Sequence, residues 1–181
     1  MAPNALDLFR AFRETPYETL KVVLLAHETC VAESADGLAY SSTCKTISYI
    51  HDVIFKDVAR EYNQTPQSPN LTPWANQGVL LLNILMSADI GLPGSHSHFG
   101  WIRFAREVME AALKKENIIV IAWGLPVQRF AQPYQDRAVV VNRPHPSINL
   151  ISQGATTFHG GFKEVNQLLT NSNKNPIQWT F

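Results

Sequence analysis

The 181-residue chain lacks several features that would place it in other classes of protein. Its 15 basic and 15 acidic side chains cancel, so no broadly basic coat is present, although a local basic groove is still compatible with this balance. No apolar run reaches the roughly 18 residues that a membrane helix needs. Internal repeats and low-complexity tracts are also absent. With 45% hydrophobic and 17% charged residues, the composition is typical of an ordinary globular domain rather than a disordered chain.

Cysteine is scarce as well. Cys30 and Cys44 are too few for a disulfide scaffold, and they suit a reducing compartment. The first residues contain no basic region followed by an apolar stretch, so we expect no secretory signal and an intracellular location. The length favours a single domain spanning residues 1–181, which would bury about 70% of its unfolded surface.

Four short apolar runs predict the strands of one sheet. Continuous rather than alternating hydrophobicity indicates strands covered on both faces, as in a parallel sheet. Helical spacing of apolar residues appears between the runs, over 47–62, 104–112 and 162–169, whereas the three prolines of 63–73 indicate a surface loop. We therefore predict a three-layer α/β/α domain around a mostly parallel four-stranded sheet. The predicted strands are Lys21–Ala26, Val79–Leu82, Ile118–Ala122 and Ala138–Val141.

Each predicted strand leads into residues that can carry chemistry. The first runs into His27 and Glu28, the second ends at Asn83, and the third ends at Trp123-Gly124. The fourth leads into the sequence RPHPS at 143–147. Because ligands of open parallel sheets bind at the carboxyl ends of the strands, we expect a carboxylate, an amide, an imidazole and a hydroxyl to meet in one pocket.

Several of these segments together resemble a known family. The sequence WANQGVLLLN at 74–83 is similar to the segment of family 1 uracil-DNA glycosylases that ends in the base-reading asparagine. The sequences SHSHFGW at 95–101, IIVIAWG at 118–124, RPHPS at 143–147 and NPIQW at 175–179 follow in the family's order and spacing. The resemblance covers about residues 16–181. It implies a uracil-DNA glycosylase-like fold and a monomeric DNA glycosylase that acts on DNA without metal, cofactor or membrane.

The first motif departs from the family pattern. The chain reads AHETCV at 26–31, where the family has Gly-Gln-Asp-Pro-Tyr-His. The resemblance places Glu28 at the position of the water-activating aspartate, and Cys30 at that of the tyrosine whose ring bars a 5-methyl group. Tyr40 takes the place of the aromatic residue that stacks on the flipped base. We include His27, beside Glu28, among the substrate-binding candidates.

The resemblance also suggests roles for the remaining candidates. Glu28 would hold a water molecule and stabilise the sugar cation, while His145 would donate to O2 of the departing base. Asn83 can read the N3–H and O4 edge of uracil, since its amide both accepts and donates.

DNA contacts are expected from Ser147, His96 and His98. Asn149 replaces the family's intercalating leucine in direct register, and Leu150 could serve with a shift of one residue. The family's proline-rich DNA loop is not recognisable in 43–48.

Several alternatives stay open on the sequence alone. The pocket beside Cys30 could admit thymine or a 5-substituted uracil, or Cys30 could be a small buried filler. The changed first motif could have abolished water activation, which would leave a reader of modified bases without catalysis. The fold could instead serve a protein–protein interaction. Finally, His96 and His98 could bind a metal together with Glu28 and His145.

Overall fold

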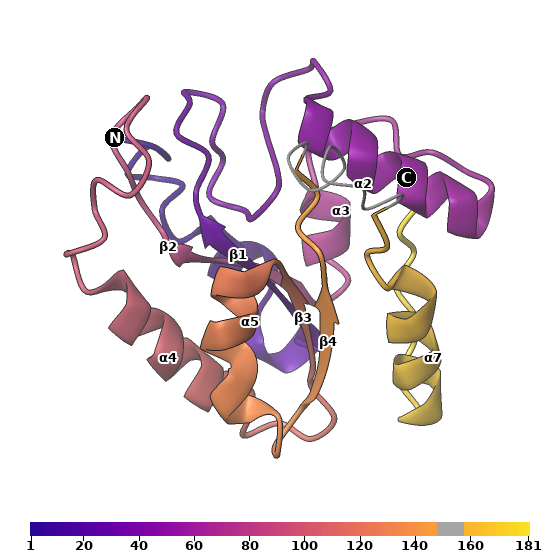
Figure 1. The fold of residues 1–181 in the computed structure, drawn as a ribbon. Helices are drawn as coiled ribbons and strands as arrows, with labels where there is room; N and C mark the ends of the chain where they lie inside the picture. The colour runs from indigo at the N-terminus through magenta and orange to yellow at the C-terminus, as the bar shows by residue number, and fades with distance from the viewer. Residues whose placement is uncertain (148–157) are drawn as a thin grey trace.

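A computed structural model describes residues 1–147 and 158–181. Its centre is a four-stranded sheet in the order β2-β1-β3-β4, with every pair of neighbouring strands parallel (Figure 1). This confirms the predicted α/β class and the parallel sheet. The strands are β1 (Val22–Glu28), β2 (Val79–Leu85), β3 (Ile119–Trp123) and β4 (Val139–Arg143).

The strands extend further toward the carboxyl edge of the sheet than the apolar runs predict. Ala26 pairs with Asn83, and Glu28 pairs with Leu85, so Glu28 and Asn83 lie inside strands and not after them. The reason is that the backbone ladder is indifferent to side-chain polarity, and the partner strand continues to offer hydrogen-bonding groups. The strand ends predicted at Ala26 and Leu82 are therefore wrong by two and three residues respectively.

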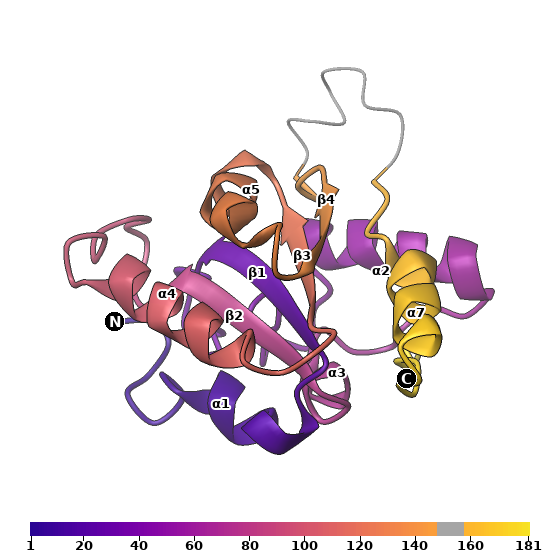
Figure 2. The ribbon, with the colours of Figure 1, turned by 90° about the horizontal axis from the view of Figure 1, so that it is seen from below.

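Helices cover both faces of the sheet, as the prediction of three layers requires. The connection from β1 to β2 runs toward one edge, whereas those from β2 to β3 and from β3 to β4 run toward the other. Because parallel crossovers are right-handed, the two sets of helices lie on opposite faces. Figures 1 and 2 show α4 (Trp101–Ala112) and α5 (Leu125–Ala131) on one face. The other face carries α2 (Tyr49–Tyr62), α3 (Thr72–Ala75) and α7 (Phe162–Asn171).

The short helical elements were not predicted. They are α1 (Arg10–Glu14), α3, α5 and the 3-10 turns Tyr17–Thr19 and Gln132–Tyr134. None is long enough to show two turns of apolar periodicity. Helix α3 begins inside the segment that we expected to be a loop, with Pro73 in its first turn, where a missing N–H costs no hydrogen bond. In the described part of the chain, no helix has the length and apolarity needed to cross a membrane.

A cluster of buried aromatic rings joins the sheet to the helices beside the carboxyl edge. The ring centroids of Trp74 and Trp179 lie 5.1 Å apart, and those of Phe162 and Trp179 lie 5.0 Å apart. Trp74 Nε1 donates a hydrogen bond to the Trp179 carbonyl. Trp123, at the end of β3, packs on Phe162 and donates from Nε1 to the Gly160 carbonyl. The cluster thereby fixes Trp123 where the sheet ends.

Gly78, just before β2, lies where the backbone packs too closely for a side chain. It has a φ of +93°, and a Cβ there would lie 2.1 Å from the Thr19 carbonyl oxygen. Gly91 has a similar φ of +77°, but a Cβ there would meet no heavy atom within 4 Å. We expect Gly91→Ala to lower the free energy of unfolding by about 1 kcal/mol, the cost of left-handed backbone alone. Gly78→Ala should cost about 1–3 kcal/mol more, because of the clash. Equal losses in urea titrations would contradict this packing.

Candidate active site

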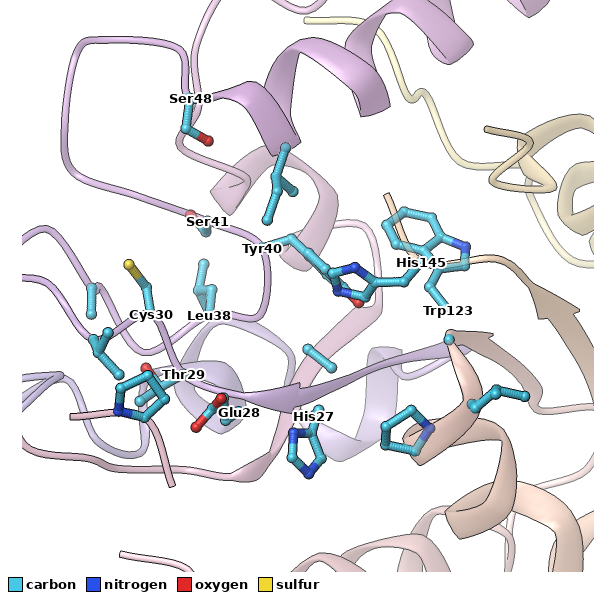
Figure 3. Close-up of a pocket in the computed structure, with 18 residues that line it drawn as sticks. His27, Glu28, Thr29, Cys30, Leu38, Tyr40, Ser41, Ser48, Trp123 and His145 are labelled. Atoms are coloured by element: carbon cyan, nitrogen blue, oxygen red, sulfur yellow. The ribbon is translucent and has the colours of Figure 1, made fainter. Parts of the chain in front are cut away.

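A cavity of about 670 Å³ opens at the carboxyl ends of β1 and β3. Figure 3 shows that the rings of Tyr40, Trp123 and His145 group together in it, while Glu28, Thr29 and Cys30 project from the end of β1. Two of the four predicted groups, the Glu28 carboxylate and the His145 imidazole, line this cavity, whereas Asn83 and Ser147 are not among its lining residues. The cavity is lined by Ala26, His27, Glu28, Thr29, Cys30, Val31, Ala35, Leu38, Tyr40, Ser41, Ser48, Ile50, Pro93, Trp123, Gly124, Leu125, Pro126 and His145.

Asn83 lies beside the site through strand register, although it is not among the residues that line the cavity. It is the partner of Ala26, which lines the cavity, and partners in a parallel ladder place their side chains on the same face. Asn83 is only 5% exposed, and its Oδ1 has no hydrogen-bond partner among the described residues. A buried acceptor without a partner costs about 1–3 kcal/mol. Asn83 therefore offers an acceptor that a ligand bearing an N–H group can satisfy.

Glu28 is held by the loop that follows β2. Its Oε2 accepts a hydrogen bond from the Gly94 backbone N–H at 2.8 Å. The side chain is half-buried, and it alternates with His27, so that these neighbours project from opposite faces of β1. One carboxylate oxygen is thus engaged by the protein, and the group has a defined orientation at the pocket.

Tyr40 forms an aromatic wall of the cavity. Its ring centroid lies 5.0 Å from that of Trp123 and 5.9 Å from that of His145. Burial raises the pKa of the phenol, which keeps the hydroxyl neutral. The hydroxyl oxygen is buried and has no hydrogen-bond partner in the described part of the chain. The ring presents a flat apolar surface of the kind on which a nucleobase stacks.

His145 follows β4 and packs against the turn that follows β3. A Cβ at Gly124 would lie 3.0 Å from the Cβ of His145, so glycine is needed there for the close approach. Burial lowers the pKa of His145, and the nearby His27 lowers it further. The imidazole is therefore neutral at pH 7 and can donate one N–H without carrying charge.

The remaining pocket candidates lie at its rim. His27 and Cys30 are both exposed, and Cys30 is a free thiol. The interpretation of Cys30 as a buried filler is wrong, because the strand has ended there and the side chain reaches the rim. Ser147 is half-buried, and its backbone N–H donates to the His145 carbonyl at 2.8 Å. Asn149 and Leu150 lie outside the described residues.

The two histidines of the predicted DNA loop differ in their surroundings. His96 is 7% exposed, stacks on Phe99 at 4.2 Å, and shares a hydrogen bond of 2.8 Å with Ser87 Oγ through Nδ1. The ring is therefore buried within its own loop and stabilises it. This placement does not favour a contact between His96 and DNA. His98 is exposed, with its ring edge-to-face against Phe99.

The structure does not favour the alternative of a metal site. Over residues 1–147 and 158–181, no group of three or more histidine, cysteine, aspartate or glutamate side chains lies close enough to hold a metal ion. His96 instead contacts Ser87 and lies 3.4 Å from Asp89 through Nε2.

Two contributors to the site were missed by sequence reasoning. The Gly94 amide that fixes Glu28 is a backbone group, and no residue pattern marks it. The Trp123 ring contributes to the wall beside Tyr40. Its position at a strand end was visible in the sequence, but the direction of the ring was not.

Comparison with known proteins identifies the family of the chain. The geometry defines an α/β domain with a pocket at the carboxyl ends of its parallel strands, beside the rings of Tyr40, Trp123 and His145. The chain is 31% identical to the uracil-DNA glycosylase of Sulfurimonas denitrificans over 98% of its own length and 81% of the relative's. It is 35% identical to that of Vibrio parahaemolyticus, covering 98% of this chain and 80% of the relative. No protein-family model matches the chain.

Solved structures agree on the fold. The mimivirus uracil-DNA glycosylase superposes with a TM-score of 0.89 at 20% identity, covering 99% of this chain and 75% of the other. The chain therefore belongs to the uracil-DNA glycosylase family, a family of DNA glycosylases. The resemblance, the fold and the enzyme class predicted from sequence are confirmed.

The state of His145 can be measured without any substrate. We expect NMR titration to give a His145 pKa below the ordinary 6.5, and His27→Ala to raise it, because the electrostatic effect of His27, which lowers this pKa, is removed. The folded state disfavours the protonated ring, so as pH falls below 6.5 the unfolded chain binds its proton first and stability declines. A His145 pKa at or above 6.5 in the parent would contradict the burial of this ring.

Proposed function

We propose that this protein hydrolyses the N-glycosidic bond between uracil and deoxyribose in DNA and leaves an abasic site. The observation that carries the proposal is that Glu28 and His145 line one cavity. Asn83, whose Oδ1 has no hydrogen-bond partner among the described residues, lies on the same face of the sheet as Glu28. A carboxylate, a neutral donor and an amide acceptor are the groups that this reaction requires.

The chemistry follows from where charge develops. As the bond breaks, the sugar gains positive charge and the departing base gains negative charge. Glu28, as a carboxylate, stabilises the sugar cation and orients the attacking water. The neutral His145 donates a hydrogen bond from its N–H to O2 of the base as negative charge accumulates there. The ring does this in the protonation state that it already has at pH 7.

Base recognition uses the other two residues. Asn83 accepts from N3–H through Oδ1 and donates to O4 through its amide nitrogen, a pattern that cytosine reverses. The flipped base stacks on Tyr40, which recovers part of the few kcal/mol that unstacking costs. We propose that Ser147 and His98 contact the DNA backbone. Asn149 or Leu150 would fill the space that the flipped base leaves in the duplex. We propose that the protein acts as a monomer.

A second candidate function is a base-binding protein with little catalysis. The observation that favours it is the hydrogen bond that the Gly94 N–H donates to Glu28, since it engages one oxygen of the proposed water-activating group. Glutamate also carries one methylene more than the family's aspartate. Misplacement of a reacting group by ~1 Å can cost about 100-fold in rate.

The role of Glu28 is tested by uracil release. We expect Glu28→Gln to lower the single-turnover rate on uracil-containing DNA by about 100-fold, because the charge facing the sugar cation is lost. Alkaline cleavage of the abasic product measures the rate. Glu33→Gln, at an exposed carboxylate on the loop that follows β1, is the matched control and should retain parental activity.

The outcomes separate the two functions. If the parent protein releases uracil and Glu28→Gln releases it more slowly, the result supports the glycosylase. DNA binding without release in the parent supports the base-binding protein, and equal release in all three preparations indicates a contaminating host enzyme.

As a refinement of this function, we propose that the pocket tolerates a substituent at C5 of the uracil ring. Cys30 is a small thiol at the rim of a cavity of about 670 Å³, where the family's tyrosine ring would occupy space beside C5. We propose that thymine or 5-hydroxymethyluracil enters this space. A pocket that tolerates one extra methyl changes selectivity by about 1–3 kcal/mol.

Cys30→Tyr tests this refinement. We expect the ratio of thymine to uracil release to fall about 10-fold or more in the variant, because the ring again meets the methyl group. Cys44→Tyr places the same ring at the other exposed cysteine, which does not line the cavity, and should leave the ratio unchanged. If parent and Cys30→Tyr show the same ratio, Cys30 does not set selectivity.

A further inference from the structure

His51 links the start of α2 to the backbone of the stacking residue. It occupies the third position of the helix and is only 5% exposed. Its Nε2 lies 2.8 Å from the Tyr40 carbonyl oxygen, and its Nδ1 lies 2.8 Å from Ser48 Oγ. Both ring nitrogens are therefore used inside the protein, at the edge of the cavity that Tyr40 and Ser48 line.

The direction of these hydrogen bonds follows from the groups involved. A carbonyl oxygen only accepts, so Nε2 must carry the hydrogen and donate to Tyr40. Burial lowers the pKa of His51, against smaller opposing effects from this hydrogen bond and from Asp36, so the ring holds a single proton. Nδ1 is then an acceptor, and the Ser48 hydroxyl donates to it.

Tyr40 needs such support, because its backbone is unfavourable for its residue type. Its φ is +60°, a left-handed conformation that a bulky aromatic side chain rarely adopts. The flanking residues are fixed by Asp36, which accepts from the Leu38 N–H and from Ser41 Oγ. The Tyr40 carbonyl is fixed by His51. The carbonyl carbon and Cβ are bonded to the same Cα, so the hydrogen bond from His51 restrains the backbone that carries the ring beside Trp123 and the cavity.

We propose that His51 is a positioning residue for base capture: by donating to the Tyr40 carbonyl it holds the Tyr40 ring in the orientation that stacks on the flipped base. The identity of that base rests on the proposed function. The contact couples the stacking ring to α2 and to Ser48. The affinity for the base therefore depends on the position of the first turn of this helix.

Two conservative variants separate the contacts of His51. The glutamine amide nitrogen reaches approximately the position of Nε2, so His51→Gln keeps the donor to Tyr40. The shorter asparagine places its amide near Nδ1, so His51→Asn keeps a partner for Ser48 and loses the donor to Tyr40. Lys56→Ala, on the exposed side of the same helix, is the control for general effects on α2.

The measurement is the base-dependent part of DNA binding. Dissociation constants are compared for DNA carrying 2′-fluoro-deoxyuridine, whose glycosidic bond resists cleavage, and for DNA carrying a tetrahydrofuran abasic analogue, which has no base to stack. We expect His51→Asn to reduce the preference for the base-bearing DNA about 10-fold, since base–aromatic stacking is worth about 1–3 kcal/mol. His51→Gln and Lys56→Ala should stay within about 2-fold of the parent, a smaller change than that loss of stacking.

A double-mutant cycle then tests whether His51 acts through Tyr40. In a Tyr40→Ala background, where no ring is left to position, His51→Asn should change the preference by less than about 2-fold, since coupled residues are not additive. If His51→Asn folds poorly, Ser48→Ala is the second variant: it removes the hydroxyl that donates to Nδ1 and that caps the His51 backbone N–H, but it keeps the Nε2 donor to Tyr40. It should give a smaller loss of the same preference.

Three results would overturn the proposal. They are an unchanged preference in His51→Asn, equal losses in the glutamine and asparagine variants, and a loss that persists in the Tyr40→Ala background. A parent that binds the base-bearing DNA preferentially but releases no uracil would contradict the proposed function and leave the positioning role measurable by the same binding ratio.

Discussion

The parallel register between β1 and β2 is the constraint on which the rest of the site depends. It places Asn83 beside Ala26 and Leu85 beside Glu28, so that the amide and the carboxylate project from the same face of adjacent strands. A slip of one residue between the two strands would leave the amide and the carboxylate on opposite faces of the sheet. The buried apolar residues that precede them in β1 and β2 fix this register, since a slip would also move them out of their packing.

Burial then determines the chemical state of the groups that the register assembles. The ring of His145 is neutral, and Tyr40 keeps its hydroxyl proton, because neither charge is favourable there. Asn83 Oδ1 and the Tyr40 hydroxyl lack hydrogen-bond partners within the described residues, which costs stability. The proposed recognition of the base would give Asn83 Oδ1 the missing partner. These uncharged groups are compatible with the polar, uncharged, flat base of the proposed function.

The sheet and much of the pocket could be predicted from sequence, for a physical reason. Strands buried on both faces must be continuously apolar, so the four runs mark them, and the parallel order brings Glu28, Asn83 and His145 to one edge. Strand ends could not be predicted, because the ladder continues through polar residues.

The direction of single side chains was also beyond the sequence. His96 packs inward and His98 outward within one short motif, and only the packing around Phe99 distinguishes them. Contacts from distant backbone, such as that of Gly94 with Glu28, or of His51 with Tyr40, leave no pattern in the residues.

The central claim is that the unpartnered Asn83 acceptor recognises the N3–H of a uracil ring. Calorimetric titration of the parent protein with free uracil and with 3-methyluracil tests it most directly, because the two ligands differ only at that hydrogen. We predict that uracil binds and that methylation at N3 weakens binding about 100-fold, since the acceptor then stays buried and unpaired and a methyl group meets it. Equal affinity for the two ligands would contradict the account.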